Sequence, residues 1–308
     1  MKIYALAPNE NWICDRFVKE WNENNPELVA TSPYDCDILW ILAGWCWNHI
    51  DYRKIDKTKT KVLVTVHHLV PENFNNQKSL LEWQVRDQIA DAYHVPCEKT
   101  KEQIQNLTEK PIYTFPFWTN DKMWHSIDRD ICRSELNLPN DKFIIGSFQR
   151  DTLGSDLISP KLEKGPDILA DTIITLSRQK DVHVLLGGWR RQYIIKRLED
   201  AKIEYTYNEL PDFSTLNKMY NSLDLYLVTS RYEGGPQAIV ECGLSKTPLI
   251  STNVGLAKEI LNPNSYTNRA GNILTCMADI EWAYNCSKEI SINEKGFDPF
   301  YKMFSEIK

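Results

Sequence analysis

The sequence predicts an α/β protein built from two Rossmann-like, doubly wound domains that face a cleft. Short apolar, β-rich segments alternate with helical segments through most of the 308 residues, and this alternation is typical of parallel sheets covered by helices. The chain is long enough for two separate hydrophobic cores. The aromatic segment Phe115–Asn120 interrupts the alternation and is the expected linker.

The first domain is expected at residues 1–122, starting directly on a strand and without the charged and apolar pattern of a signal peptide. Its expected strands are residues 2–7, 37–42, 61–66, 91–95 and 111–115, and its expected helices are residues 12–21, 80–90 and 98–107.

The second domain is expected at residues 123–277, where a helix at 129–136 leads into a second round of the same alternation. Its expected strands are residues 142–148, 182–186, 203–207, 224–229 and 247–251, and its helices are residues 165–177, 190–201, 214–221 and one that starts near Pro236. Residues 278–308 are expected to form a helical tail.

Composition excludes several classes of protein. The net charge is -6, the sequence pI is about 5.6 and 25% of residues are charged, so the chain has no global electrostatic footprint for nucleic acid. Its most apolar window, Ile38–Trp47, is shorter than the roughly 20 residues of a membrane-spanning helix. We expect a cytoplasmic protein with no transmembrane segment; a local basic patch and peripheral contact with a membrane stay open.

Eight cysteines are scattered along the chain without a Cys-x-x-Cys pair or a histidine at zinc spacing. We therefore expect reduced thiols and no metal site.

One stretch, residues 230–243, carries most of the functional information. Glu233 and Glu241 flank the turn Gly234-Gly235-Pro236, which is expected to open a helix between two buried strands. Proline suits the first helical position, and glycine lets the backbone approach a ligand. A helix N-terminus attracts anions, whereas carboxylates accept hydrogen bonds from sugar hydroxyls. This combination indicates a site for a phosphate and a polyol, although most glutamates in proteins are merely solvated.

The pattern resembles the paired glutamates, with seven residues between them, of the retaining glycosyltransferases of family 4. The resemblance extends over one stretch of the chain, at Asp224, Ser230, Glu233, Gly234, Glu241, Gly243, Pro248 and Gly255. It implies the two-domain GT-B fold, a nucleoside-diphosphate sugar as donor, and a C-terminal tail that returns toward the first domain. It also implies that Glu233 binds the sugar and that Glu241 binds the ribose, with Gly234, Gly235, Pro236 and Gln237 around the donor.

Two cations are expected to hold the diphosphate. Arg150 follows the first strand of the second domain, and Lys164 precedes a helix start at Gly165. In a site without metal, such cations stabilise the negative charge that develops on a leaving diphosphate. The resemblance gives the same role to Arg150 and Lys164. The loop between them is longer than in the family and contains Lys161, which could replace Lys164 or be an ordinary surface lysine.

Other parts of the site are expected from strand ends. His67 and His68 follow a strand of the first domain, where open α/β sheets place their ligands, and the resemblance places His67 at the donor sugar. It also implies that the backbone near Leu210 holds the base.

The acceptor side is the part of the site where the chain departs from the family. Relatives have a glycine-containing loop after the first strand, whereas this chain has Asn9, Asn11 and Trp12 there. These three residues are candidates for contact with the acceptor. Trp40, Trp45, Trp47 and Trp118 could add a stacking surface, although aromatic residues beside apolar strands more often belong to the core.

The sequence thus predicts a retaining glycosyltransferase of the hexosyltransferase type, acting in glycan biosynthesis. It would use a UDP- or GDP-linked sugar, need no cofactor, and transfer to a glycan, a lipid-linked or a small-molecule acceptor. A nucleotide-sugar epimerase or hydrolase, or an inactive nucleotide-sugar-binding protein, stays as an alternative. A Rossmann oxidoreductase is disfavoured because no Gly-x-Gly-x-x-Gly follows a strand.

Overall fold

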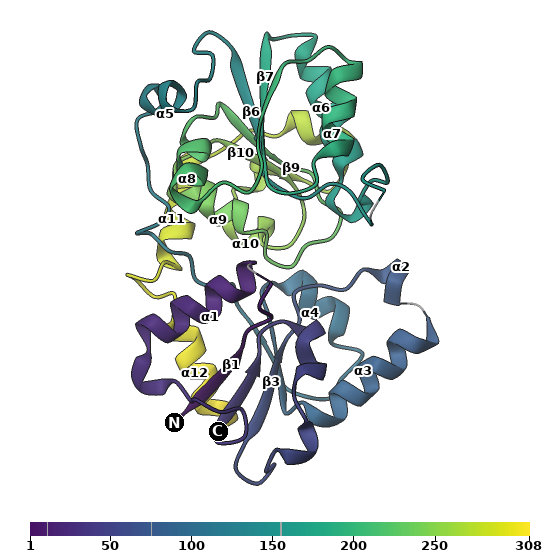
Figure 1. Cartoon of the computed structure of the whole chain (residues 1–308), viewed down its shortest axis with the longest axis vertical. Coiled ribbons are helices and arrows are strands. Elements are labelled where there is room, and N and C mark those ends of the chain that lie inside the picture. The colour runs from purple at the N-terminus through teal and green to yellow at the C-terminus, as the bar shows by residue number, and fades with distance from the viewer. Residues whose placement is uncertain (11, 75, 155) are drawn as a thin grey trace. The chain divides into compact units, whose positions relative to one another are not determined.

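The computed structural model describes residues 1–10, 12–74, 76–154 and 156–308, which form two compact units (Figure 1). The first unit contains Met1–Pro116 and Phe297–Lys308, and the second contains Phe117–Gly296. Each unit has one parallel sheet flanked by helices. The predicted α/β class with two Rossmann-like parallel sheets is therefore confirmed.

The sheet of the first unit has five parallel strands whose spatial order follows the sequence, β1-β2-β3-β4-β5. All four residues of β2 and of β4 are buried, as expected for strands covered on both faces. The strands are β1 (Ile3–Leu6), β2 (Ile38–Ile41), β3 (Lys61–Thr65), β4 (Ala92–Val95) and β5 (Ile112–Thr114). The helices are α1 (Ile13–Asn24), α2 (Pro71–Phe74), α3 (Gln77–Ile89), α4 (Glu98–Ile104) and α12 (Asp298–Ile307), with 3₁₀ turns at Pro26–Leu28, Gly44–His49 and Tyr52–Lys54.

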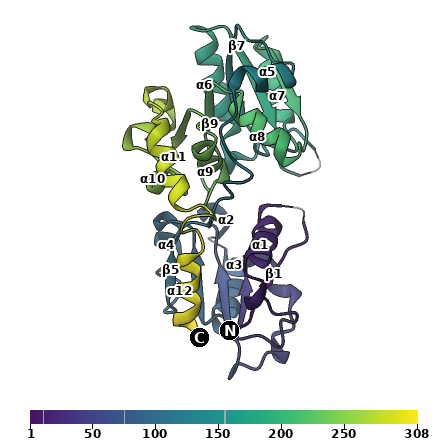
Figure 2. The same ribbon diagram turned by 90° about the vertical axis from the view of Figure 1, so that its left-hand side faces the viewer.

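Aromatic packing joins α12 to the rest of the first unit, alongside its strands (Figures 1 and 2). Phe300 and Phe304 are fully buried, and their rings lie 5.4 Å from the ring of Trp40 in β2. Trp21 in α1 contacts Phe304 at 5.3 Å in an edge-on geometry, which is favoured for aromatic pairs. The last helix of the chain is thus part of the first core.

The second unit has six strands in the order β11-β10-β9-β6-β7-β8. The chain runs outward from β6 to β8 and then returns to place β9 beside β6, so the strand order reverses between these two strands. The strands are β6 (Phe143–Ser147), β7 (Val182–Gly187), β8 (Tyr205–Asn208), β9 (Leu225–Val228), β10 (Leu249–Thr252) and β11 (Tyr266–Thr267). The helices are α5 (Arg129–Glu135), α6 (Pro166–Ser177), α7 (Gln192–Asp200), α8 (Phe213–Asn221), α9 (Gln237–Leu244), α10 (Ala257–Ile260) and α11 (Ile280–Glu289), with 3₁₀ turns at Leu162–Lys164, Pro263–Ser265 and Ala270–Thr275.

Backbone hydrogen bonds join the two ends of the second unit. The backbone of Thr119 exchanges hydrogen bonds with Ile290 and Ile292, at 3.0 and 2.9 Å, so the segment after Phe117 is tied to the end of α11. The helix α11 therefore lies in the second unit and packs on α9, whereas α12 lies in the first. The expected helical tail is in this way divided between the two units.

The structure leaves all eight cysteines as thiols. Within the described residues, none of the helices combines the length and the apolar character needed to cross a membrane.

Close contact between α9 and α11 predicts the effect of Gly243→Ala. An added Cβ would lie 2.1 Å from Ser287 Oγ and 2.7 Å from the carbonyl oxygen of Ala283, so the helices must separate. We expect a loss of about 1–3 kcal/mol in unfolding free energy, measured by urea denaturation. Gly271→Ala is the control because no atom lies within 4 Å of its added Cβ; an equal loss in both variants would contradict the prediction.

Burial of His94 predicts a loss of stability in acid. Its Nε2 donates to the carbonyl of Phe115 at 3.0 Å and its Nδ1 accepts from Thr65 at 3.2 Å, and burial lowers the pKa of His94 to about 3 from 6.5. Between these two values the unfolded chain binds a proton that the folded chain does not. Stability should therefore fall as pH falls below 6.5, by up to about 1.4 kcal/mol per pH unit.

The measurement is the unfolding free energy at pH 7 and pH 5 for the wild type and His94→Gln. The variant should lose less stability between the two pH values than the wild type does. The exposed His49→Gln is the control and should keep the wild-type slope. A slope in His94→Gln as steep as in the wild type would exclude His94 as its source.

Candidate functional site

The candidate site of the second unit lies at the reversal of strand order. The loops that leave the carboxyl ends of β6 and β9 come from neighbouring strands on the two sides of this reversal. Open α/β sheets bind ligands at such a switch point. The order of the first sheet does not reverse, so the topology favours the second unit for nucleotide binding.

A close backbone approach brings two segments of this site together. Gly165 has φ 62° and lies against the end of β9, where an added Cβ would be 1.9 Å from the carbonyl oxygen of Thr229. Thr229 Oγ1 donates to the carbonyl oxygen of Gly165 at 2.9 Å. The amides of Arg231 and Tyr232 donate to the carbonyl of Glu163 at 2.8 and 3.1 Å. Only glycine fits both the left-handed backbone and the short distance.

The result is an ion pair between Lys164 and Glu233, whose Nζ and Oε1 are in direct hydrogen-bond contact. Ser230 Oγ lies 3.2 Å from the same carboxylate oxygen. Gln149 Nε2 donates to the carbonyl of Lys164 at 2.8 Å, and its Oε1 lies 3.3 Å from Ser230 Oγ. Both charged side chains keep some exposure, 22% for Lys164 and 13% for Glu233, so a ligand can reach them.

Lys161 and Arg150 extend this cationic group. Burial lowers the pKa of Lys161, the positive charges of Lys164 and Arg150 lower it further, and Glu163 opposes them. The Nζ of Lys161 lies 3.5 Å from Glu163 Oε1. Lys164 is therefore the lysine that contacts Glu233, while Lys161 lies near enough to add positive charge.

The long loop between Arg150 and Lys164 forms a small hairpin with an antiparallel bridge between Thr152 and Pro160. Its base contains a fully buried ion pair, in which Arg191 Nε lies 2.9 Å from Asp151 Oδ2. Arg191 also donates to the carbonyls at the ends of β6 and β7, at 2.6 and 2.9 Å. Burial raises the pKa of the Asp151 carboxyl and the charge of Arg191 opposes this. The pair thus fixes the hairpin to the ends of the strands.

The hairpin orients Arg150. Its Nε donates to the carbonyl of Thr152 at 2.9 Å, and its guanidinium lies 5.5 Å from the ring of Trp189. Sequence reasoning missed Asp151, Arg191 and Trp189, because a partner across a loop leaves no local pattern.

The two paired glutamates have different environments. Glu241 is only 5% exposed, and its Oε2 accepts a hydrogen bond of 2.8 Å from the phenol of Tyr220. Burial, followed by the Glu241 carboxylate, raises the pKa of Tyr220 well above its usual value. A fully buried charge needs such a partner, and this partner on α8 was also missed from the sequence.

Gly255 packs closely against the glycine turn that lies between the two glutamates. Gly255 has φ 49°, and an added Cβ would lie 2.5 Å from the carbonyl of Gly234 and 2.6 Å from Cδ of Pro236. The helix α9 begins at Gln237, so Pro236 precedes the first helical residue instead of occupying it. Leu210 is 63% exposed with φ 48° and follows β8, which β7 separates from β6.

In the first unit, His67 lies two residues beyond β3 and is linked to the neighbouring segments. Its Nε2 donates to the carbonyl of Leu42 at 2.9 Å and lies 3.6 Å from the Cys14 thiol. Its ring is 5.9 Å from Trp45. Trp40 and Trp118 are fully buried, which confirms the core interpretation for both, whereas Trp45 is 52% exposed.

The loop after β1 folds around Asp15. The carboxylate of Asp15 accepts the backbone N–H groups of Asn9, Glu10 and Trp12 at 2.8, 2.8 and 3.2 Å, and Asn9 takes a left-handed φ of 59°. Trp12 is 50% exposed. Asn11, the third acceptor-side candidate, lies outside the described residues.

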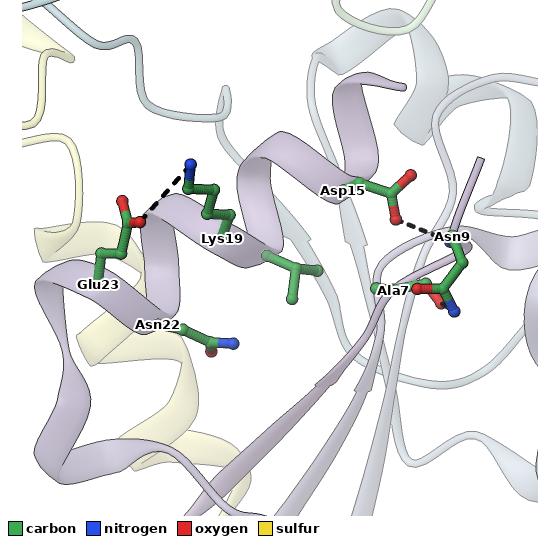
Figure 3. Close-up of a pocket in the computed structure, with 7 residues that line it drawn as sticks. Ala7, Asn9, Asp15, Lys19, Asn22 and Glu23 are labelled. Carbon is green, nitrogen blue, oxygen red and sulfur yellow. Dashed lines mark hydrogen bonds and ion pairs between the residues drawn. The ribbon is translucent and has the colours of Figure 1, made fainter. Parts of the chain in front are cut away.

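Beside this loop is an open pocket of about 460 Å³, shown in Figure 3. It is lined by Ala7, Asn9, Asp15, Val18, Lys19, Asn22 and Glu23. Lys19 and Glu23 form an ion pair at 3.8 Å, but both are largely exposed, so this pair contributes little to stability.

Across the described residues, His, Cys, Asp and Glu side chains form no group of three or more that could hold a metal ion. Lys164 supplies a positive charge in contact with Glu233, and Lys161 interacts electrostatically with both Lys164 and Arg150.

The fold is that of the GT-B glycosyltransferases, as comparison with solved structures indicates. The Anabaena protein Alr3699/HepE in complex with UDP-glucose shares 14% identity at a TM-score of 0.72, over 99% of this chain and 97% of that chain. Sucrose-phosphate synthase from Thermosynechococcus elongatus shares 18% at 0.63, over 98% and 77%. A glycosyltransferase from Rickettsia africae shares 17% at 0.66, over 98% and 84%.

Residues 156–284 match the family model of the glycosyl transferases group 1. This segment contains Lys164, Glu233 and Glu241. The family-model match and the fold together support glycosyltransferase as the class of enzyme. A search among curated proteins gave no match.

Gly165→Ala tests the close approach that builds the site. Its matched control is Gly154→Ala, because Gly154 has a similar φ of 55° and no atom within 4 Å of the added Cβ. Both variants should lose about 1–2 kcal/mol for the left-handed backbone, and Gly165→Ala should lose several kcal/mol more through its clash with Thr229. Urea denaturation measures both losses, and equal values would contradict the packing described for Gly165.

Proposed function

We propose that the chain is a retaining glycosyltransferase of family 4 that transfers a sugar from a nucleoside-diphosphate donor to an acceptor hydroxyl. The observation that carries the proposal is the Lys164–Glu233 pair at the reversal of the second sheet. It combines a cation for the diphosphate with a carboxylate for sugar hydroxyls. The group 1 match over the same residues supports this interpretation.

In the proposed reaction, the bond between the anomeric carbon and the diphosphate oxygen breaks, and its electron pair goes to the diphosphate. The acceptor oxygen bonds to the anomeric carbon on the same face, and its proton passes to the leaving phosphate oxygen. Arg150, Lys164 and Lys161 stabilise the negative charge that develops. The N–H groups of the turn from Gly234 to Gln237 add donors.

Glu233 is proposed to accept hydrogen bonds from the donor sugar, and Ser230 keeps its carboxylate in place. Glu241 is proposed to bind the ribose, and the hydrogen bond from Tyr220 would hold it in one orientation. His67 is proposed to contact the donor sugar, and the backbone at Leu210 the base. The donor is proposed to be UDP- or GDP-linked and the sugar a hexose. UDP-sugars are the first to test because Alr3699/HepE was crystallised with UDP-glucose.

A thermal-shift experiment tests the assignment of the donor site. UDP, GDP, UDP-glucose and GDP-mannose are added to the wild type, Lys164→Ala, Glu233→Gln and Lys196→Ala. Lys196 is an exposed lysine paired with Asp200 on α7, so its variant is the control. A ligand at one hundred times its Kd should stabilise the folded state by about 2.7 kcal/mol.

The variants should differ in a defined way. Lys164→Ala should weaken binding of both the nucleotide and its sugar by roughly tenfold or more, as a charge-assisted hydrogen bond is lost. Glu233→Gln should keep nucleotide binding and lose the additional affinity for the sugar. Stabilisation of all four proteins by the same amount would contradict the site.

Product analysis tests the reaction itself. With a bound donor and an acceptor, NMR should show a product with the anomeric configuration of the donor, and inversion would contradict retention. Release of free sugar without transfer would indicate a hydrolase, and a changed donor would indicate an epimerase. Binding without turnover under any condition would indicate an inactive binding protein.

A further inference from the structure

Side chains that can stack on a sugar ring or accept its hydroxyl groups lie beyond the carboxyl ends of three neighbouring strands of the first unit. In the order β1-β2-β3, the segments beyond their carboxyl ends carry Glu10, Trp45 and His67. The indole Nε1 of Trp45 donates to Glu10 Oε1 at 3.2 Å, and the indole ring lies 5.9 Å from the His67 imidazole. Glu10 and Trp45 are termed the Trp45 face, and His67, which is proposed above to contact the donor sugar, adjoins it.

Trp45 differs in exposure from the tryptophan of β2. Trp40, five residues earlier, is fully buried in the aromatic core, whereas Trp45, beyond the end of the strand, is 52% exposed. An exposed indole ring has a large, flat apolar surface on which the C–H face of a sugar ring can stack. The hydrogen bond to Glu10 restrains the indole, so the ring is ordered before any ligand arrives.

Two carboxylates, those of Glu10 and Asp15, lie at this face, and the guanidinium of Arg86 lies beside Gly44, where its Nη1 would be 3.2 Å from an added Cβ. The carboxylate of Asp15 accepts the backbone N–H groups of Asn9, Glu10 and Trp12, and Figure 3 shows its contact with Asn9. Successive backbone N–H groups can bind an anion when they have no such partner. Burial raises the pKa of the Cys14 thiol to about 12, and the carboxylates of Asp15 and Glu10 add to this rise. The same two carboxylates raise the pKa of the Cys46 thiol, after burial. An anionic ligand at Trp45 would be repelled by the carboxylates of Glu10 and Asp15 and would find the backbone N–H groups of Asn9, Glu10 and Trp12 already used.

We propose that the Trp45 face binds a neutral sugar ring of the acceptor, and that its negative charge excludes acceptors phosphorylated or carboxylated at this ring. The apolar C–H face of the ring stacks on the indole, and its hydroxyls donate to Glu10. The proposal rests on the proposed function, because it names the acceptor class of that reaction. It adds no chemical step of its own.

The Trp45 face is an acceptor site and not a second part of the donor site. This distinction can be measured, since a residue that binds only the acceptor changes the acceptor KM and leaves donor binding unchanged. The variants are Trp45→Ala, Trp45→Phe and Glu10→Gln. The control is Trp282→Ala, which removes a similarly exposed tryptophan, 47%, from α11 of the second unit.

The first readout is binding without turnover. Saturation-transfer NMR is recorded with the methyl glycosides of glucose, galactose and N-acetylglucosamine, and with glucose 6-phosphate and glucuronic acid. The wild type, Trp45→Phe and Trp282→Ala should bind at least one neutral glycoside, and Trp45→Ala should not. Glucose 6-phosphate and glucuronic acid should bind more weakly than the neutral sugars, and Glu10→Gln should reduce that difference.

The second readout is transfer with the donor identified by thermal shift. Trp45→Ala should raise the KM of the neutral acceptor about tenfold, the loss expected for one aromatic stacking contact, with the donor KM and nucleotide stabilisation unchanged. Trp45→Phe should recover most of the loss, which a merely structural change would not do.

Three results would overturn the proposal, two of them in the transfer experiment. One is a higher donor KM with an unchanged acceptor KM in Trp45→Ala, and the other is equal or better use of the anionic sugars by the wild type. Absence of any neutral-sugar binding would overturn it as well. Failure of every nucleotide to stabilise the wild type would instead refute the proposed function, and glycoside binding that still depends on Trp45 would then show that the face itself is correct.

Discussion

The close approach of Gly165 to the end of β9 is the constraint on which the candidate site depends. It places the start of α6 within hydrogen-bond reach of Thr229, so that Lys164 and Glu233, 69 residues apart in sequence, form an ion pair. A side chain at position 165 would separate these segments. The hairpin from Asp151 to Lys161 lies just before Lys164 in the chain. The buried Arg191–Asp151 ion pair holds this hairpin to the ends of the strands. Together, the close approach and the buried pair hold Lys164 at Glu233 and place Arg150 and Lys164 near enough to Lys161 to lower its pKa.

The two units differ in the charged groups and backbone N–H groups at the carboxyl ends of their strands. In the second, strand order reverses between β6 and β9, and the loops beyond these strands carry Arg150 and the Lys164–Glu233 pair. In the first, strand order does not reverse, and the backbone donors after β1 are taken by the chain's own Asp15. This difference is consistent with the proposed function, in which the second unit binds a charged donor and the first a neutral acceptor.

Much of the fold and part of the candidate site could be predicted from the sequence, because the signals for them lie in short stretches of the chain. Most strands and helices were expected close to their observed bounds, because β-rich runs and helical segments alternate along the chain, whereas the short elements α2, α10 and β11 were not expected. Glu233, Glu241 and the turn between them stand out because a charge in an apolar stretch and a Gly-Gly-Pro turn are visible as letters. The burial of Glu241 against Tyr220, the hairpin and the exposure of Trp45 were not predictable, since each depends on residues far away along the chain. The same limit applies to the helical tail, which sequence treats as one segment and packing divides between two units.

The sequence by itself determined the α/β class, the alternation of strands and helices, and the residue types present at the proposed donor site. These follow from local hydrophobic pattern and turn chemistry, which need no partner across space. Only the tertiary structure decided which lysine meets Glu233, which tryptophans are core and which backbone donors Asp15 occupies. Those outcomes depend on strand order and on backbone distances of a few ångströms, and both are set when separate segments pack against one another.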